Sequence, residues 1–233
     1  KILRMFNNIK VVAFDADDTL WVNETYFREA EEIFGKPLAH NETPNQEQQE
    51  LYKTEIHNLS IYGYGVKGFM LSMLEAGLKL SNGQLSARDM NRILDIGKEM
   101  LNKPVELLPG VRTVLEELHK TYKLILVTKG DLLDQERKLE KSGLSGFFHH
   151  VEILSDKKES DYEKLVKRLE LPKSSLMMVG NSLKSDVLPL VDIGVKAVHI
   201  PFHTTWAHEE AEPRLQESYE QLNQISELID LLK

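Results

Sequence analysis

Four short apolar runs limit most strongly what this chain can fold into. Runs of this length that are rich in branched and aromatic side chains are typical of strands buried on both faces of a sheet. They predict strands at Lys10–Asp15, Lys123–Thr128, Ser175–Asn181 and Lys196–Ile200, and a weaker strand at His150–Ile153.

Between these runs lie stretches in which apolar residues recur with the helical period of about 3.6. They predict helices over 110–119, 131–142, 161–169 and 185–193. Gly143 and Gly194 follow two of these stretches as stop signals, and Pro189 must lie near the start of the last helix. Strands that alternate with helices indicate an α/β fold built on a doubly wound, Rossmann-like parallel sheet.

One interval breaks this alternation. About 90 residues separate the first strand from Leu107, and they contain several helix-like stretches. The predicted helices are 26–34, 46–59, 67–80 and 90–101, the last preceded by Ser86 as N-cap with Asp89 at N3. We interpret 21–106 as a helical domain inserted into a core formed by 1–20 and 107–233. The segment 212–233 carries an amphipathic stripe, expected to pack on the core, of Leu215, Tyr219, Leu222, Ile225 and Ile229.

Composition excludes several functional classes. The 29 Lys and Arg residues against 37 Asp and Glu residues give a net charge of −8, which is unlike the basic character of nucleic-acid-binding proteins. The chain has no cysteine, which excludes disulfides, zinc–thiolate sites, iron–sulfur clusters and a cysteine nucleophile. No apolar run reaches the roughly 18 residues of a membrane span, and the start KILRMFNN has no apolar signal core. We therefore expect a soluble, cytoplasmic protein that binds neither nucleic acid nor membrane.

Polar residues follow the predicted strands. In open parallel sheets, ligands bind at the carboxyl ends of the strands. We therefore expect a set of carboxylate, hydroxyl, amide and ammonium groups to meet at one edge of the sheet. The set comprises Asp15 to Thr19, Thr128 to Gly130, Asp156 to Lys158, and Gly180 to Ser182 with Asp186.

This mixture of groups suits phosphate chemistry. Two carboxylates in a half-buried site need a cation, and oxygen ligands suit magnesium. An aspartate that attacks a phosphate ester also brings two anions together, and their repulsion is about 4 kcal/mol at about 4 Å and an effective dielectric of about 20. A metal ion, a lysine and hydroxyl donors would offset that repulsion.

Four segments carry a family resemblance. FDADDTL, LVTKG, SDKK and VGNSLKSD resemble, in order and spacing, the four motifs of the haloacid dehalogenase-like (HAD) hydrolases. The resemblance extends from Lys10 to His199, and the helical insert resembles the cap domain of that family. It implies a Mg²⁺-dependent phosphatase that hydrolyses a small phosphorylated metabolite through an aspartyl-phosphate intermediate.

The resemblance implies a role for individual residues. Asp15 would be the nucleophile. Asp17 would protonate the leaving oxygen and then activate water, which is worth about 10²–10⁴-fold in rate. Thr128 would donate to a phosphoryl oxygen, and Lys157 would neutralise the phosphate. Mg²⁺ would be held by Asp15, Asp186 and the backbone carbonyl of Asp17. Relatives that cleave carbon–halogen bonds lack an acid at the position of Asp17, so Asp17 favours phosphoryl transfer.

Two positions need separate treatment. Asn181 stands where the family often has aspartate, and its amide could hold the metal directly or through water with less ligand charge. Lys157 precedes Tyr162 by five residues, as in relatives, and is preferred to Lys158 as the catalytic lysine.

Neighbouring residues have simpler expected roles. Asp18 is predicted to be a turn or helix-cap residue, and Thr19 to support the turn through local hydrogen bonds. The side chain of Lys129 is predicted to face solvent. The backbone N–H groups of Lys129 and Gly130 could bind phosphate at the start of the following helix.

The segment NLSIYGYGVKGF (58–69) of the insert contains candidate specificity residues. Tyr64 and Lys67, with Tyr62, could face the substrate, or the segment could be a helix junction packed by aromatic side chains. We expect the insert to close over small molecules through hinges near 21–23 and 102–106.

Several other functions are open to a chain of this pattern. A phosphomutase would use the same aspartyl-phosphate, and a phosphonate hydrolase would need a Schiff-base lysine such as Lys53 or Lys67. A phospho-receiver domain has another order of motifs and about half the length, and the retained acids argue against an inactive binding scaffold. His199, His203 and His208 could suggest zinc, but His199 falls within a predicted strand and no carboxylate or cysteine joins it at ligand spacing, so a structural loop PFHTTWAH is the better interpretation. The oligomeric state is not readable from the sequence.

Overall fold

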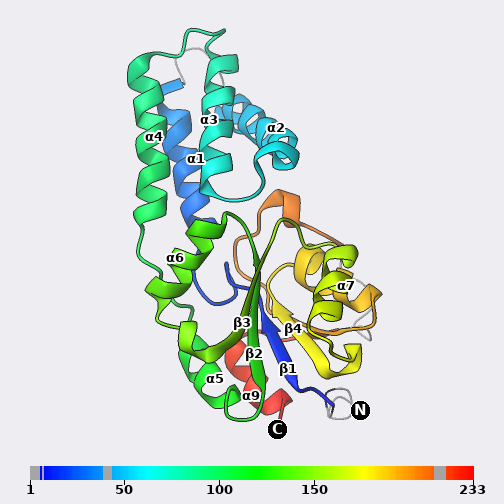
Figure 1. The fold of residues 1–233 in the computed structure, drawn as a ribbon. Coiled ribbons are helices and arrows are strands. Elements are labelled where there is room, and N and C mark those ends of the chain that lie inside the picture. Colours follow the sequence, from blue (N-terminus) through cyan, green and yellow to red (C-terminus); the bar gives the residue numbers. More distant parts are fainter. Residues whose placement is uncertain (1–5, 7, 39–43, 213–218) are drawn as a thin grey trace. The chain divides into compact units, whose positions relative to one another are not determined.

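The computed structural model describes residues 6, 8–38, 44–212 and 219–233 (Figure 1). The chain divides into two compact units. The sheet unit comprises Lys1–Glu24, Val105–Lys129 and Glu136–Lys233, and the helical unit comprises Thr25–Pro104 and Gly130–Gln135. Residues 1–5 and 7 of the N-terminal segment, and Leu215 of the predicted stripe, lie outside the described residues.

A parallel sheet forms the centre of the sheet unit. Its strands are paired in the order β3-β2-β1-β4-β5-β6, and every pairing is parallel. The five predicted strands all form, and β6 is an addition that the sequence pattern did not predict. The strands are β1 (Val11–Phe14), β2 (Lys123–Lys129), β3 (Phe148–Leu154), β4 (Leu176–Gly180), β5 (Lys196–His199) and β6 (Glu220–Gln221).

Helices cover both faces of this sheet. Successive strand side chains point to opposite faces. Val12 and Phe14 pack with α5 (Val111–Leu118), α9 (Leu228–Leu231) and Leu139 of α6 (Leu132–Ser142). Val11 and Ala13 pack on the other side with α7 (Glu159–Arg168) and α8 (Leu188–Asp192). Because both faces are buried at the centre of the sheet, β1 (VVAF) and β4 (LMMVG) carry no polar side chain, which explains their continuous apolar runs. This architecture is the α/β, Rossmann-like fold that the alternation predicts.

The strand order places the ends of β1, β2 and β4 side by side. β1 lies in the interior of the sheet, with Phe14 level with Leu126 of β2 and Val179 of β4. From β1 the chain forms β2 and then β3 on one side of β1. It then crosses back and forms β4, β5 and β6 on the other side. Such a reversal leaves room for a ligand beyond the carboxyl ends of the strands.

Four helices form the helical unit: α1 (Glu24–Leu38), α2 (Pro44–Tyr62), α3 (Val66–Leu80) and α4 (Ala87–Asn102). Their core includes Phe34, Leu51, Phe69, Met73 and Ile93. Each predicted helix of the interval is confirmed and extends slightly beyond its predicted bounds. Ser86 is the N-cap of α4, and its hydroxyl accepts a hydrogen bond from the Asp89 backbone N–H at 3.1 Å.

Two predicted segments differ from the structure. The stretch 185–193 is divided into a π-helical turn (Leu183–Val187) and α8, with Pro189 in the first turn of α8. Pro189 has no N–H to donate, so the turn before it does not continue as a regular α-helix. This turn places Ser185 and Asp186 at the end of β4.

The amphipathic stripe of the last segment is buried but not on one helix. Tyr219, Leu222 and Ile225 are buried, and Ile229 packs against the same core as Ile225. The backbone instead pairs β6 with β5 and becomes α-helical only from Leu228. Strand pairing with β5 is a long-range interaction, so the local periodicity could not reveal it.

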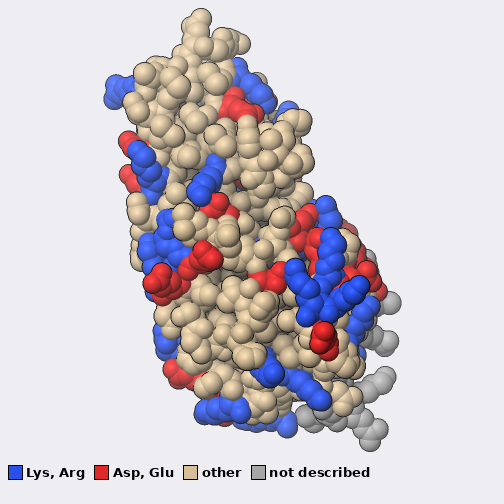
Figure 2. Space-filling model, viewed as in Figure 1, with Lys and Arg blue, Asp and Glu red and all other residues tan. Residues whose placement is uncertain are grey.

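Charge is mixed on the molecular surface. On the face in Figure 2, basic and acidic side chains alternate, most densely over α7, whose sequence ESDYEKLVKR carries both signs. Within the described ranges, no helix has the length and apolar character that crossing a bilayer requires.

Candidate active site

One lysine joins two acids beyond the ends of β1 and β4. Lys157 Nζ lies 2.5 Å from Asp15 Oδ1 and 2.7 Å from Asp186 Oδ1. All three residues are buried. A methyl group at Gly180 would overlap the Asp186 carboxylate, so the absence of a side chain there lets the π-helical turn approach the strand.

The two carboxylates of this group outnumber its single ammonium group. Burial, and then repulsion by Asp186, raise the pKa of Asp15 to about 7, although Lys157 lowers it. Burial lowers the pKa of Lys157, but Asp15 and Asp186 outweigh it and hold that pKa well above its usual value. Two buried carboxylates thus share one ammonium group. A further cation would stabilise the ionised form of both acids.

Oxygen atoms converge beside Asp15. Thr19 Oγ1 donates to Asp15 Oδ2 at 3.0 Å. With its amide nitrogen turned inward, Asn181 donates to Asp15 Oδ2 at 3.3 Å and to the Asp17 backbone oxygen at 3.2 Å. A ring nitrogen of His199, Nε2, lies 3.0 Å from the Asn181 backbone oxygen.

These donors fit magnesium. Carboxylate, carbonyl and amide oxygens are the ligands that Mg²⁺ takes in proteins, usually together with several waters. Asp15, Asp186 and the backbone oxygen of Asp17 would hold the ion, with Asn181 beside them. In the part of the chain that the structure describes, no three His, Asp or Glu side chains are grouped to hold a metal ion. The set therefore depends on a backbone oxygen as well as on carboxylates, and the Asn181 amide nitrogen donates to both kinds of oxygen.

The carboxylate of Asp17 makes separate contacts. Its Oδ1 accepts from Trp21 Nε1 at 2.7 Å and from Lys138 Nζ at 2.9 Å. Neither donor was predicted from the sequence. Trp21 lies four residues after Asp17 within a turn, which is only a weak signal of their contact, and nothing in the sequence around Lys138 points to Asp17.

Asp18 has the structural role that the sequence predicts. Its carboxylate accepts from the backbone N–H groups of Asn23, at 2.8 Å, and Glu24, at 2.9 Å, where α1 begins. Asp18 adopts a left-handed conformation with φ of 61°, which aspartate tolerates better than most residues. The predicted local hydrogen bond of Thr19 is also present.

Lys129 does not face solvent, which corrects the prediction. Its side chain is 16% exposed and forms an ion pair with Glu209, and its Nζ lies 2.9 Å from Ser185 Oγ. Glu209 Oε2 accepts from Ser182 at 2.6 Å and from Ser185 at 2.5 Å. Burial raises the pKa of Glu209, but Lys129 and the serines outweigh it and lower that pKa to about 2. The partner is 80 residues away along the chain, so local sequence gave no sign of it.

The other predicted residues of the sheet unit differ in burial. Thr128 is buried at the end of β2, and its Oγ1 lies 3.5 Å from the Lys129 backbone oxygen. Lys158 has a side chain that is 70% exposed and pairs with Asp156 at 2.8 Å. The Tyr162 hydroxyl donates to the Ser185 backbone oxygen at 2.8 Å. Since Lys157 contacts Asp15, this geometry favours Lys157 over Lys158.

The remaining predicted residues belong to the helical unit. Lys67 Nζ contacts the two carboxylate oxygens of Asp131 at 3.0 and 3.1 Å, and Tyr64 is half-buried. Gly130 belongs to this unit as well. Gly63 and Gly65 have φ values of 73° and 110°, which produce the predicted bend between α2 and α3.

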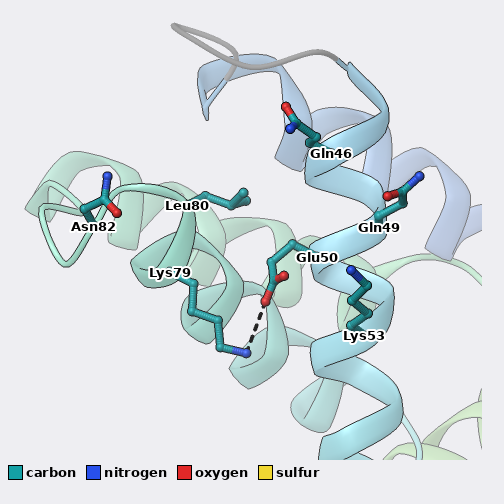
Figure 3. Close-up of a pocket in the computed structure, with 7 residues that line it drawn as sticks. All are labelled: Gln46, Gln49, Glu50, Lys53, Lys79, Leu80 and Asn82. Carbon is teal, nitrogen blue, oxygen red and sulfur yellow. Dashed lines mark ion pairs between the residues drawn. The ribbon is translucent and has the colours of Figure 1, made fainter.

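A polar pocket of about 560 Å³ also lies in the helical unit (Figure 3). The ion pair of Lys79 with Glu50, at 3.2 Å, crosses it, and Lys53 lies beside that pair. It is lined by Gln46, Gln49, Glu50, Lys53, Lys79, Leu80 and Asn82.

Two curated phosphatases match part of the chain. A glyceraldehyde 3-phosphate phosphatase from Pyrococcus abyssi is 33% identical over 98 residues, which are 39% of this chain and 41% of that enzyme. An N-acylneuraminate-9-phosphatase from Mus musculus is 29% identical over 96 residues, or 39% of each protein. The chain thus matches about two-fifths of the length of these relatives.

Solved structures match almost the whole chain. A haloacid dehalogenase-like family hydrolase from Xanthomonas campestris has a TM-score of 0.85 and 38% identity, covering 96% of this chain and 92% of that one. A 2-haloacid dehalogenase from Pseudomonas syringae pv. Tomato has a TM-score of 0.65 and 20% identity, covering 96% and 98%, and shares the fold. Residues 9–194, which contain all four motifs, match the family model of haloacid dehalogenase-like hydrolases. The chain therefore belongs to the haloacid dehalogenase-like hydrolases.

Proposed function

We propose that this hydrolase is a Mg²⁺-dependent phosphatase that acts on a small phosphorylated metabolite through an aspartyl-phosphate on Asp15. The observation that carries the proposal is the buried contact of Lys157 with both Asp15 and Asp186, together with a second acid at Asp17. The two partial matches to enzymes named as phosphatases support the same reaction class.

In the first step, a carboxylate oxygen of Asp15 attacks the phosphorus atom of the substrate. The bond between phosphorus and the ester oxygen breaks, and the leaving oxygen takes the proton of the Asp17 carboxyl group. Lys157 offsets the repulsion between the nucleophile and the phosphate, and Thr128 donates a hydrogen bond to a phosphoryl oxygen. Mg²⁺, when bound, supplies positive charge to the phosphoryl oxygens.

In the second step, water attacks the phosphorus atom of the aspartyl-phosphate. Asp17, now a carboxylate, takes a proton from that water, and the bond between phosphorus and Asp15 breaks. Inorganic phosphate leaves, and Asp17 again carries the proton that the next cycle needs. Each of the two acids therefore returns to its starting state.

The helical unit is proposed to act as the cap that selects the substrate. Most of its sequence, Thr25–Pro104, is inserted between β1 and β2. The candidate specificity residues Tyr64 and Lys67 belong to the bend before α3 and to its first turn. Asp17 separates this proposal from carbon–halogen cleavage, because a halide leaving group needs no proton.

Hydrolysis of p-nitrophenyl phosphate tests the proposal. We expect turnover with Mg²⁺, none with a chelator, and a loss of more than about 10³-fold in Asp15→Asn, which removes the nucleophile. Asp95→Asn on α4 is the matched control, because it makes the same change at an exposed site in the helical unit. Full activity of Asp15→Asn would contradict the proposed nucleophile.

A further inference from the structure

The carboxylate of Asp17 is held by two donors from different parts of the sheet unit. Trp21 Nε1 and Lys138 Nζ both donate to Oδ1, at 2.7 and 2.9 Å. Lys138 also donates to Asn23 Oδ1 at 2.8 Å. One ammonium group on α6 therefore contacts both ends of the segment 17–23.

That segment is restrained by its own hydrogen bonds. Asp18 binds the backbone N–H groups of Asn23 and Glu24, and Trp21 is fully buried. Backbone bridges join Trp21 to Asp17 and to Leu107. The indole N–H is thus a fixed donor, and Lys138, with 19% of its side chain exposed, completes the contact from α6.

Two donors on one carboxylate oxygen restrain the orientation of the whole group. Each oxygen of a carboxylate has about two in-plane lone pairs. Trp21 donates to Oδ1 from the turn after β1, and Lys138 donates to the same oxygen from α6. Together the two donors fix the rotation of the carboxylate group about its bond to the rest of the side chain.

We propose that Lys138 is a positioning residue for the phosphatase reaction proposed above, and that together with Trp21 it orients the Asp17 carboxyl group toward the leaving oxygen. This inference rests on the proposed phosphatase function, because it assigns Lys138 a task only in proton transfer from Asp17. Among the hydrogen bonds and ion pairs of the described residues, none joins Lys138 or Trp21 to Asp15 or Asp186.

A series of phenyl phosphates whose leaving groups differ in basicity tests this inference. It distinguishes a loss of the orientation of Asp17 from a general weakening of the fold. A basic phenolate needs the proton of Asp17 more than p-nitrophenolate does. The probes are p-nitrophenyl, phenyl and p-methylphenyl phosphate, and the readout is kcat/KM, which covers the steps up to release of the phenol. A variant that only weakens the fold lowers kcat/KM by the same factor for all three esters.

We expect Lys138→Met to lower kcat/KM for p-methylphenyl phosphate by about 30-fold and for p-nitrophenyl phosphate by less than about fivefold, within the range of general acid catalysis. Lys138→Arg should recover part of the loss, since its guanidinium can donate to both Asp17 and Asn23. Asp17→Asn gives the limit without an acid. Lys141→Met, an exposed lysine on the same helix, is the matched control and should leave all three values unchanged.

The outcomes are distinct. Selective loss for the basic leaving groups in Lys138→Met, or in Trp21→Phe if the first variant does not fold, supports the inference. Equal loss for all three esters, an unchanged pattern or a gain would overturn it while leaving the phosphatase function intact. Absence of Mg²⁺-dependent hydrolysis of every ester by the wild type would overturn both.

Discussion

Two adjacent lysines provide a matched test at the scale of single residues. Lys157 is buried between Asp15 and Asp186, whereas Lys158 is exposed and pairs with Asp156. We expect Lys157→Met to lower kcat/KM for p-nitrophenyl phosphate by about 100-fold or more, since it removes the positive charge that offsets the repulsion between Asp15 and the phosphate in the transition state. Lys158→Met should stay within about threefold, because exposed ion pairs contribute about 0–1 kcal/mol. Comparable losses in the two variants would refute the assignment of Lys157.

Single residues were predictable where their task is local. Asp18 and Thr19 make their contacts within a few residues. Lys157 was preferred to Lys158 only through the family resemblance, from its five-residue spacing to Tyr162, because its contacts with Asp15 and Asp186 span 142 and 29 residues. Lys129 was wrongly expected to face solvent because Glu209 reaches it from a loop far along the chain. Lys138 was missed for the same reason, since its partner Asp17 is 121 residues away.

At the scale of elements, Glu55 makes the packing of α2 sensitive to pH. It is buried, and its Oε2 has no hydrogen-bond partner among the described residues. Burial, and then repulsion by Glu31, raise the pKa of Glu55 to about 8, although Arg28 of α1 lowers it. Between the usual pKa of 4.5 and about 8, the folded chain holds a proton that the unfolded chain lacks. The stabilisation that the folded chain gains by keeping Glu55 protonated is full below pH 4.5 and is lost as pH rises through about 8.

Replacing that carboxyl group should remove the pH dependence. Glu55→Gln cannot ionise, so its stability relative to the wild type should increase with pH, by at most about 1.4 kcal/mol per pH unit across this window. Thermal unfolding midpoints near pH 5 and near pH 9 measure the change. The exposed Glu99→Gln on α4 serves as the control. An identical difference between Glu55→Gln and the wild type at both pH values would mean that Glu55 does not titrate in this window.

Helices and strands were predictable where burial against a core imposes one regular spacing of apolar residues. The apolar runs became strands because both faces of the sheet are covered, and the helices of the inserted segment followed their 3.6-residue spacing. In the segment after residue 218, a long-range pairing and not the local period determines the backbone. Tyr219, Leu222 and Ile225 are buried as expected, yet the pairing of β6 with β5 determines the backbone there. The three-residue spacing of these side chains fits a helix, but pairing with the neighbouring strand β5 makes residues 220–221 a strand.

At the scale of the whole chain, binding at the site should be measurable as stability. A ligand that binds only the folded state at about 100 times its Kd adds about 2.7 kcal/mol. For chains of this size, about 1 kcal/mol raises the midpoint by roughly 2–4 °C, so the expected rise is about 5–10 °C. Mg²⁺ with beryllium fluoride, which mimics a phosphoryl group on aspartate, is the probe, and calorimetry is the measurement.

The two units make this whole-chain measurement more informative than a single midpoint. Each unit has its own apolar core, and the acids that would bind the probe lie in the sheet unit. We therefore expect the rise in the unfolding of the sheet unit, no rise with beryllium fluoride and chelator, and none in Asp15→Asn, which has no carboxylate to accept the group. An equal rise in Asp15→Asn would show that the anion binds elsewhere, because the stabilisation attributed to the aspartate requires that carboxylate. A rise that extends to the unfolding of the helical unit would mean that the two cores become coupled when the site is filled, as expected for a cap that closes over its substrate.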